Sequence, residues 1–461
     1  MKNYISLKLW LIAGLLFTVS SCDNFVDVEL PNSQLTAPAV FEDMATANAA
    51  MTSIYSNMRD KGMLTGAPLG LSQQLGNYAD ELDFYGYPQS STNFYYLNAL
   101  TPSLQDIKSL WTESYNQIYA ANAVIYGAEN STTLSAANKN QLRGEALFVR
   151  AFLHFYLVNL FGDIPYITTT DYEVNSTVSR MPAATVYGLI KADLAAALDL
   201  LSQDYLSSNR VRPNKLAARS VLARVNLYMG NWDEASNDAS AVINATDLYS
   251  IETNIDAAFL KTNPSTIWQF SPALSSNNTE EGSTFLFTSG PPPMSALTNT
   301  LVNSFDTADL RKTHWIGNVT DGTTTWYYAN KYKNMLTEGG SMEHSIVLRL
   351  EEQYLIRAEA RAHQGNLTGA KDDLDKIRTR AGLPNTAAVT DTELIAAVLE
   401  ERKLEFFTEM GHRFFDLKRT NNLNSVLGTV KLGWQNTDKL LPLPVSELTL
   451  NPNLAPQNPG Y

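Results

Sequence analysis

The most continuous hydrophobic pattern in the chain is the stretch from Gly144 to Phe161, in which thirteen of eighteen residues are apolar. So many apolar positions do not fit on one face of a helix, and a helix that is apolar nearly all round must be covered on most sides. Gly162 supplies a C-terminal stop, and Pro165 prevents the helix from resuming. The charges within the stretch, and its length, argue against a membrane span. The pattern predicts an inner scaffold helix.

Other segments also predict helices. Residues 41–58 and 107–126 carry apolar side chains at the i, i+3, i+4 spacing of an amphipathic helix. The alanine-rich segment 184–201 follows a proline, and residues 392–418 form a long charged segment that we also expect to be one helix. The tail, residues 421–461, is rich in proline and predicts no obvious helix.

Two segments share a helix–turn–helix pattern. In residues 213–245 a tight turn at Gly230-Asn231 separates two stretches whose small alanines allow helices to approach closely, which resembles a tetratricopeptide hairpin. Residues 347–383 repeat the pattern at matching offsets, and the stretch ending in Gly162 looks like the first helix of another unit. The predicted fold is mainly α, a tetratricopeptide-like helical repeat scaffold with an irregular, loop-rich insert that contains short strands.

The helical pattern is interrupted twice. Residues 61–103 lose the period and become rich in Gly, Ser, Asn and aromatic residues, and residues 250–345 are similar in composition. In the second segment, Asp321-Gly322 lies between two stretches rich in β-branched and aromatic residues, which predicts a β-hairpin. Alternation along this hairpin would place Trp326 and Tyr328 on one side and Tyr327 on the other.

The N-terminus has the features of an export signal. Lys2 and Lys8 flank the start of an apolar run, residues 9–19, which is followed by two serines and Cys22. This order is typical of a secretory signal and is too short for a stable membrane helix. Cys22, the only cysteine, lies where a bacterial lipoprotein signal is cut and acylated. We therefore expect residues 1–21 to be a signal peptide and Cys22 to be a lipid anchor.

The charge of the chain limits the class of partner. The formal net charge is −13 and the sequence pI is about 4.9. Proteins that bind nucleic acid concentrate positive charge, so a nucleic-acid partner is not expected.

Short motifs spread over the whole chain form a set. They begin directly after Cys22, are most typical around residues 144–165, and end with the C-terminal sequence Gln457-Asn458-Pro459-Gly460-Tyr461. Between these points the further positions are Trp111, Tyr115, Ile118, Asn122, Val347-Leu348-Arg349, Glu359-Ala360, Arg378, Arg380-Ala381-Gly382-Leu383, Glu401-Arg402, Glu405-Phe406, Gly411, Arg413, Asp416-Leu417, Arg419, Leu443-Pro444, Glu447-Leu448 and Asn451-Pro452-Asn453. In these motifs the chain resembles the SusD-like, or RagB-like, nutrient-uptake lipoproteins of the Bacteroidetes outer membrane.

The resemblance implies a non-catalytic protein that binds an oligosaccharide or polysaccharide and delivers it to a SusC-type TonB-dependent transporter in the outer membrane. It also implies that Cys22 anchors the protein to that membrane, with the body at the cell surface. Some members of the family handle peptides, so a peptide-capturing protein is one alternative. A repeat scaffold that binds only proteins is another.

The resemblance also implies how the chain is organised. We expect one body over residues 22–461. Its helical scaffold would occupy about 41–250 and 346–420, its ligand region about 61–103 and 250–345, and its tail 421–461.

Sugar rings present flat C–H faces and rows of hydroxyls, so their binding sites combine aromatic rings with amide and carboxylate groups. Residues 78–96 contain seven aromatics among nineteen residues without a helical period, and the 280–330 region adds further aromatics. Trp111 and Trp232, at helical spacing, are expected in the core. The candidate ligand residues are Asp80, Tyr85, Tyr87, Asn93, Tyr95, Tyr96, Phe287 and Trp326.

No catalytic, cofactor or metal motif is expected. Glu401, Glu405 and Glu409 are spaced at i, i+4 and i+8 and alternate with arginines, as in a charged helix with ion pairs. The five histidines are scattered and lack the spacing of a zinc motif, and no phosphate-binding loop or nucleophile motif is present.

Overall fold

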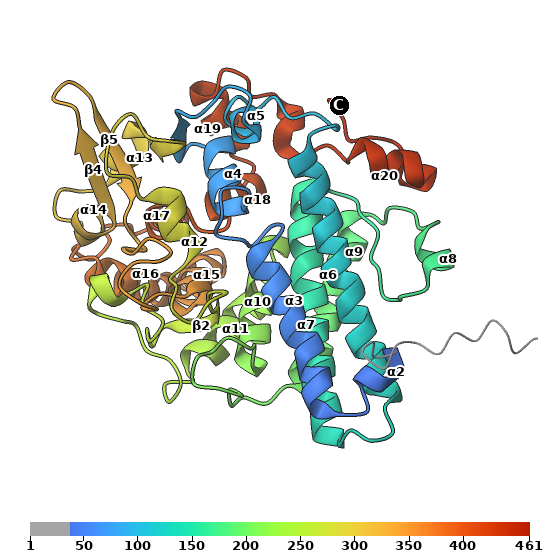
Figure 1. Ribbon diagram of the computed structural model, residues 1–461. Coiled ribbons are helices and arrows are strands. Elements are labelled where there is room, and N and C mark those ends of the chain that lie inside the picture. Colours follow the sequence, from blue (N-terminus) through green and yellow to red (C-terminus); the bar gives the residue numbers. More distant parts are fainter. Residues whose placement is uncertain (1–36) are drawn as a thin grey trace, which may run out of the picture.

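A computed structural model describes residues 37–461 of the protein, and helices dominate it (Figure 1). Cys22 and the predicted signal peptide lie outside the described residues. The helices are α2 (Ala37–Val40), α3 (Met44–Asp60), α4 (Leu71–Tyr78), α5 (Ser91–Tyr96), α6 (Gln105–Asn130), α7 (Ala136–Phe161), α8 (Tyr172–Asn175), α9 (Ala183–Leu200), α10 (Lys215–Met229), α11 (Trp232–Ile243), α12 (Glu280–Phe285), α13 (Asn299–Ser304), α14 (Leu310–His314), α15 (Leu350–His363), α16 (Leu367–Arg380), α17 (Asp391–Phe406), α18 (His412–Arg419), α19 (Leu423–Val430) and α20 (Val445–Leu450).

The strands are short and form two sheets. One sheet has the order β1-β3-β5-β4, and the other pairs β2 with β6. Their bounds are β1 (Leu82–Phe84), β2 (Thr266–Phe270), β3 (Ser295–Leu297), β4 (Ile316–Thr320), β5 (Thr325–Ala329) and β6 (Ser345–Arg349). The mainly α fold with a strand-containing insert is confirmed.

Helix α7 is the inner scaffold helix that the hydrophobic pattern predicts. Ser135 caps its first turn by accepting a hydrogen bond from the Asn138 N–H, and Gly162 ends it with a φ of 76°. Every residue from Gly144 to Phe161 is buried, with α6 and α9 packed along its sides (Figure 1). Within residues 37–461, α7 is the one helix long and apolar enough to cross a membrane, and its apolar window is wholly buried inside the protein.

The two predicted helical hairpins are present as α10–α11 and α15–α16. Gly230 and Gly365 make their turns in the left-handed region, at φ of 73° and 76°. Helix α11 packs against α15, so the hairpins stack through a small core of alanines and isoleucine. One boundary differs from the prediction, because Val347–Arg349 belongs to strand β6 and not to the repeat helix.

The prediction of one helix over 392–418 is wrong, because the chain breaks between α17 and α18. In this break Thr408, Met410 and Gly411 all have positive φ, at 55°, 43° and 77°. The turn directs the Glu409 carboxylate to Arg349 Nε at 2.9 Å and to the Lys331 ammonium. A continuous helix would not direct Glu409 to Arg349 and Lys331, and these buried ion pairs would be lost.

The tail also contains more structure than expected. Helices α19 and α20 lie within residues 421–461, and Leu423 and Leu427 of α19 are buried in the main core. Near the C-terminus, the Asn458 side chain donates to the backbone oxygens of Phe161 and Leu441, at 2.8 and 2.7 Å. Tertiary contacts of this kind stabilise short helices whose local sequence gives little signal.

The β4–β5 hairpin is confirmed, with Ile316 paired to Ala329 and Thr320 paired to Thr325. Asp321 accepts from the N–H groups of Thr323 and Thr324, and Gly322 has a φ of 93°. The expected alternation is also confirmed, because Trp326 and Tyr328 contact one hydrophobic cluster and Tyr327 packs against another.

Glu401 and Glu405 of α17 are buried and form the ion pairs that a charged helix predicts, whereas Asp391, Glu393 and Glu400 of the same helix are exposed. Glu405 is fully buried and accepts from Arg311, Arg349 and Arg380. These arginines come from α14, β6 and α16, so the cluster joins the insert to the repeat scaffold.

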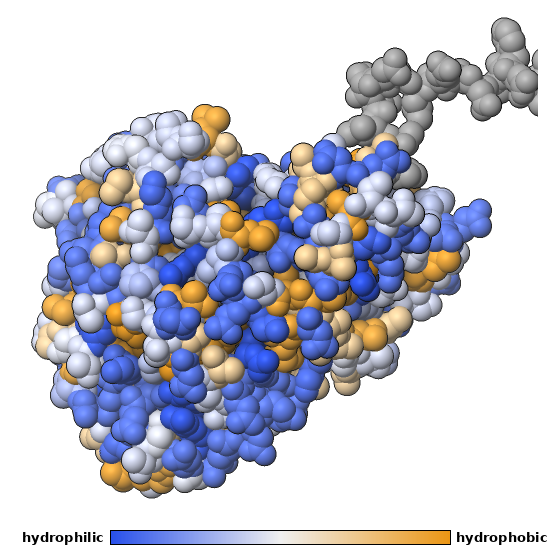
Figure 2. All heavy atoms as spheres, turned by 90° about the horizontal axis from the view of Figure 1, so that it is seen from below, coloured by the Kyte–Doolittle hydropathy of each residue, from blue (hydrophilic) through white to orange (hydrophobic). Residues whose placement is uncertain are grey.

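On the outer surface of the protein, seen from below in Figure 2, polar residues predominate and hydrophobic groups are scattered.

Candidate functional site

The β1-β3-β5-β4 sheet brings together the two stretches that the sequence marks as candidates for ligand binding. Strand β1 follows α4 and pairs antiparallel with β3, so that Leu82 faces Leu297 and Phe84 faces Ser295. The Tyr85 N–H extends the pairing by donating to the Met294 oxygen at 2.7 Å. Strand β3 also pairs with β5 at Tyr327.

Four aromatic residues lie in strand β1, which contains Asp83, or in the segment that follows it, and we call them the aromatic patch: Phe84, Tyr85, Tyr87 and Tyr96. Tyr85 is 43% exposed and Tyr87 is 83% exposed. The Tyr96 hydroxyl donates to Asp83 Oδ1 at 3.4 Å, and the Tyr96 ring centroid lies 6.4 Å from that of Phe84. The patch therefore offers accessible ring faces beside a carboxylate.

Lys431, from the end of α19, belongs to the same site. Its Nζ lies 4.2 Å from the centroid of the Tyr96 ring and donates to the Asn77 backbone oxygen at 2.6 Å. Burial lowers the pKa of Lys431 to about 8, and the nearby Asp83 and Asp80 charges oppose that shift. Burial raises the pKa of Asp83, which Lys431 and Tyr96 partly offset. Nothing in the local sequence marks Lys431, because it reaches the site only through the folding of the tail.

Trp326 and Phe287 lie beneath the patch. Each is only 7% exposed, and both pack with Ala296 in one hydrophobic cluster. A Cβ atom at Gly290 would lie 2.1 Å from the Trp326 ring, so this position needs glycine for the ring to fit. Burial and the Asp83 charge raise the pKa of Tyr85, and a hydrogen bond with Trp326 opposes them. The structure thus places Trp326 as a buried support for Tyr85, and Phe287 in the same hydrophobic cluster as Trp326.

Tyr95 requires a correction, because it is fully buried and faces the core instead of a ligand. Residues 91–96 form α5, so adjacent side chains point in different directions. Tyr95 packs edge-on against Tyr78, with the ring centroids 5.9 Å apart.

Asp80 and Asn93 are occupied by contacts within the protein. The Asp80 carboxylate accepts from Arg413 Nε and Nη2 at 2.8 and 2.7 Å. Although burial acts to raise the pKa of Asp80, the Arg413 hydrogen bond and charge lower it overall. The Asn93 amide donates to the Pro88 oxygen at 2.9 Å and so holds the loop that carries Tyr87. Asp80 and Asn93 therefore fix the backbone on either side of the patch residues Tyr85 and Tyr87.

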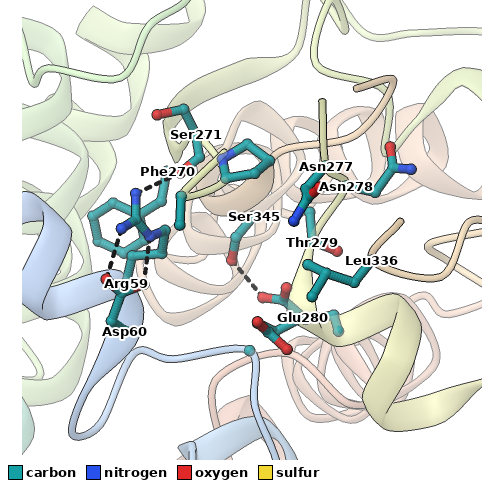
Figure 3. A pocket seen from close by; sticks show the side chains of 14 residues that line it. Arg59, Asp60, Phe270, Ser271, Asn277, Asn278, Thr279, Glu280, Leu336 and Ser345 are labelled. Carbon is teal, nitrogen blue, oxygen red and sulfur yellow. Dashed lines mark hydrogen bonds and ion pairs between the residues drawn. The ribbon is translucent and has the colours of Figure 1, made fainter. Parts of the chain in front are cut away.

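A small polar pocket, separate from the aromatic patch, lies between the end of α3 and the start of α12 (Figure 3). Its volume is about 50 Å³, which suits a few water molecules. The hydroxyl of Ser345, which Figure 3 labels, donates to the buried Glu281 carboxylate. Among residues 37–461, no group of three or more His, Cys, Asp or Glu side chains is arranged to hold a metal ion.

Two family models match the chain. The model described as "Starch-binding associating with outer membrane" matches residues 24–227, and the model described as "SusD family" matches residues 281–461. The two matches cover the aromatic patch, the tail and most of the helical scaffold, and they leave out α11 and strand β2.

Similar proteins agree with these matches. The chain is 28% identical to the SusD-like protein P2 of Formosa agariphila, over 97% of this chain and 98% of that one. It is also 33% identical to the starch-binding protein SusD of Bacteroides thetaiotaomicron, over 28% of this chain and 25% of that one.

Solved structures share the fold. A SusD superfamily protein from Bacteroides vulgatus superposes with a TM-score of 0.80 at 23% identity, covering 91% of this chain and 99% of that one. A laminarin-binding SusD-like protein superposes with a TM-score of 0.75 at 23% identity, covering 90% and 99%. The chain belongs to the SusD/RagB-like family.

Proposed function

We propose that the protein captures an oligosaccharide or polysaccharide at the aromatic patch and delivers it to a SusC-type TonB-dependent transporter. Members of the family bind glycans in nutrient uptake, and they are not enzymes. Two similar proteins are named for their glycans, starch and laminarin. The observation that carries the proposal is the exposure of Tyr85 and Tyr87 just after strand β1, which contains Asp83, at an edge that two distant segments of the chain build together.

The chemistry of the aromatic patch suits a sugar. The exposed faces of Tyr85 and Tyr87 can cover the C–H face of a ring, which places apolar area against apolar area. Asp83 can accept hydrogen bonds from hydroxyls, and the half-buried Tyr96 hydroxyl lies beside it. Opposite charges on Asp83 and Lys431 keep the site close to neutral, which favours an uncharged ligand over an ionic one.

The patch is also held rigidly. Asn93 fixes the loop that carries Tyr87, the Tyr85 backbone is paired to Met294, and Trp326 packs below. A site whose rings are already in place loses little conformational entropy when a ligand binds.

Delivery requires the protein to be at the membrane. We propose that Cys22 is acylated and anchors the body to the outer membrane with the patch at the cell surface. The family description, which includes association with the outer membrane, supports this proposal. The transporter is the partner that such an anchored binding protein would serve.

The test is isothermal titration of residues 23–461, which include every described element, against a panel of polysaccharides and peptides. We expect one glycan to bind and the Tyr85→Ala/Tyr87→Ala variant to bind it about tenfold more weakly, because two ring contacts are lost. Tyr126→Ala removes a 68% exposed tyrosine from α6 and is the matched control.

Other outcomes separate the alternatives. Binding of peptides without any glycan would identify a peptide-capturing protein. Co-purification with the transporter, together with no binding of either ligand class, would identify a scaffold that binds only proteins.

A further inference from the structure

A groove lies between α6, the loop that carries α8, and α20. Figure 1 labels these three helices in its right half. Its volume is about 430 Å³, within the range of about 300–1,000 Å³ that small-molecule sites occupy. None of its lining residues belongs to the aromatic patch.

Aromatic side chains form two walls and the floor of this groove. Tyr119 on α6 is 51% exposed and Tyr172 at the start of α8 is 81% exposed. Trp111 and Tyr115 lie deeper, with their ring centroids 4.9 Å apart. The exposed tyrosines leave ring faces that nothing within the described fold covers fully.

Side-chain hydrogen bonds fix the walls in place. The Tyr115 hydroxyl donates to the Pro165 oxygen at 2.8 Å, and the Asn175 amide donates to the Thr169 oxygen at 2.9 Å. From the other side, the Asn451 amide donates to the Val178 oxygen at 2.8 Å. The loop is therefore tied both to α6 and to the C-terminal segment.

Thr112, Asn175 and Glu447 bring oxygen acceptors to the groove, and the Thr112 hydroxyl can also donate. Thr112 Oγ1 and Asn175 Oδ1 are buried and have no hydrogen-bond partner among residues 37–461. The Glu447 carboxylate forms no ion pair with any described residue. Burial raises the pKa of Glu447, and the Lys108 charge opposes this shift. Both residues line the groove, and a buried polar atom normally has a partner, so a ligand that donates hydrogen bonds would supply what these two oxygens lack.

We propose that this groove is a second saccharide site, which binds one or two rings of a neutral sugar. A sugar ring supplies both a flat apolar face for Tyr119 or Tyr172 and several hydroxyl donors for Thr112, Asn175 and Glu447. An extended peptide fits less well, because its backbone presents as many carbonyl acceptors as N–H donors. A fatty acid fits less well because its carboxylate would face the Glu447 carboxylate.

The test uses trisaccharides, which are too short to bridge two separate sites. Residues 23–461 are titrated with maltotriose and laminaritriose, and hydrogen exchange is followed in residues 165–178 and 445–454. We expect one trisaccharide to slow exchange in both segments. Tyr172→Ala should weaken that binding about tenfold through the lost ring contact, and Thr112→Val should weaken it by removing only the hydroxyl.

Tyr126→Ala is the control, because it removes an exposed tyrosine from the same helix outside the groove. The proposal is overturned if neither trisaccharide slows exchange in these segments, or if Tyr172→Ala binds as Tyr126→Ala does. Protection of the same segments by a peptide would overturn it equally. Because Tyr85→Ala leaves the groove intact, failure at the aromatic patch and failure at the groove are distinguishable.

Discussion

Asp80 and Arg413 form a two-pronged ion pair that joins the residues after α4 to α18, with N–O distances of 2.8 and 2.7 Å. Both side chains are largely buried, at 12% and 13% exposure. This pair lies directly before β1, so it fixes the position from which the aromatic patch begins.

Asp80→Asn should therefore lower stability and leave the ring contacts of the patch intact. Neutralising one member of a buried pair leaves Arg413 with an uncompensated charge, at a cost of about 3 kcal/mol in the free energy of unfolding. Denaturant unfolding measures the change, with the exposed Asp247→Asn as control. A variant that kept its stability but lost glycan affinity would instead make Asp80 a ligand contact.

Substitution of Tyr95 should affect only the stability of the protein, and substitution of Tyr85 should affect mainly its affinity for the glycan. Tyr95→Phe removes a buried hydroxyl with no partner in residues 37–461, so stability should stay equal or rise by up to about 1 kcal/mol. Its glycan affinity should not change. Tyr85→Ala should reduce affinity with little effect on stability, because Tyr85 is 43% exposed. Titration and thermal unfolding of both variants make the comparison, and loss of affinity in Tyr95→Phe would contradict the assignment of Tyr95 to the core.

Glu405→Gln should destabilise the protein strongly. Glu405 accepts from Arg380 at 2.6 and 2.5 Å, from Arg349 at 2.5 Å and from Arg311 at 3.0 Å. An amide of the same shape leaves these buried arginines short of negative charge, at a cost of about 4 kcal/mol. Chemical unfolding should show this shift, whereas Glu400→Gln, at a position that is 49% exposed, should change little. Equal effects in the two variants would show that the cluster does not stabilise the fold.

Because His154 is buried as a neutral ring, we expect the free energy of unfolding to decrease in mild acid. Its Nδ1 faces the Arg150 oxygen at 2.8 Å and its Nε2 accepts from the Ile167 N–H at 3.2 Å, so the neutral ring is the one that fits. Burial lowers the pKa of His154 to about 3. The unfolded chain therefore takes up the proton first, and stability falls as the pH drops from about 6.5 towards 3.

The comparison with His154→Gln isolates this group. The free energy of unfolding of the wild type should fall faster with decreasing pH than that of the variant, by at most about 1.4 kcal/mol per pH unit. Parallel curves between pH 6.5 and 4 would show that His154 is not responsible.

Periodic helices could be predicted from the sequence, and irregular joints could not. The apolar stretch that became α7 and the two hairpin turns at Gly230 and Gly365 are encoded locally. The break at residues 407–411 is not, because Thr408 and Met410 adopt positive φ only where Arg349 and Lys331 hold Glu409. Likewise, α19 depends on the main core that Leu423 and Leu427 enter.

The candidate site could be located from composition but not resolved into roles. The excess of aromatics in residues 78–96 marked the region that forms the aromatic patch. Which rings are exposed depends on α5 and on the sheet, so that Tyr96 lines the patch and the neighbouring Tyr95 does not. Lys431 and the groove beside α20 arise from the tail, where no pattern in the sequence indicated a site.

The pairing of β1 with β3 has a consequence for the order of assembly. The Thr298 hydroxyl donates to the Asp80 backbone oxygen across 218 residues of chain. Closing so long a loop costs entropy that local helices do not incur, so the helical hairpins can form before this edge does. A chain interrupted before β3 would keep the first helical hairpin, α10–α11, but would lack the second, α15–α16, and the strand that pairs with β1 beside the patch. Capture of ligand is thus a property that only the nearly complete chain acquires.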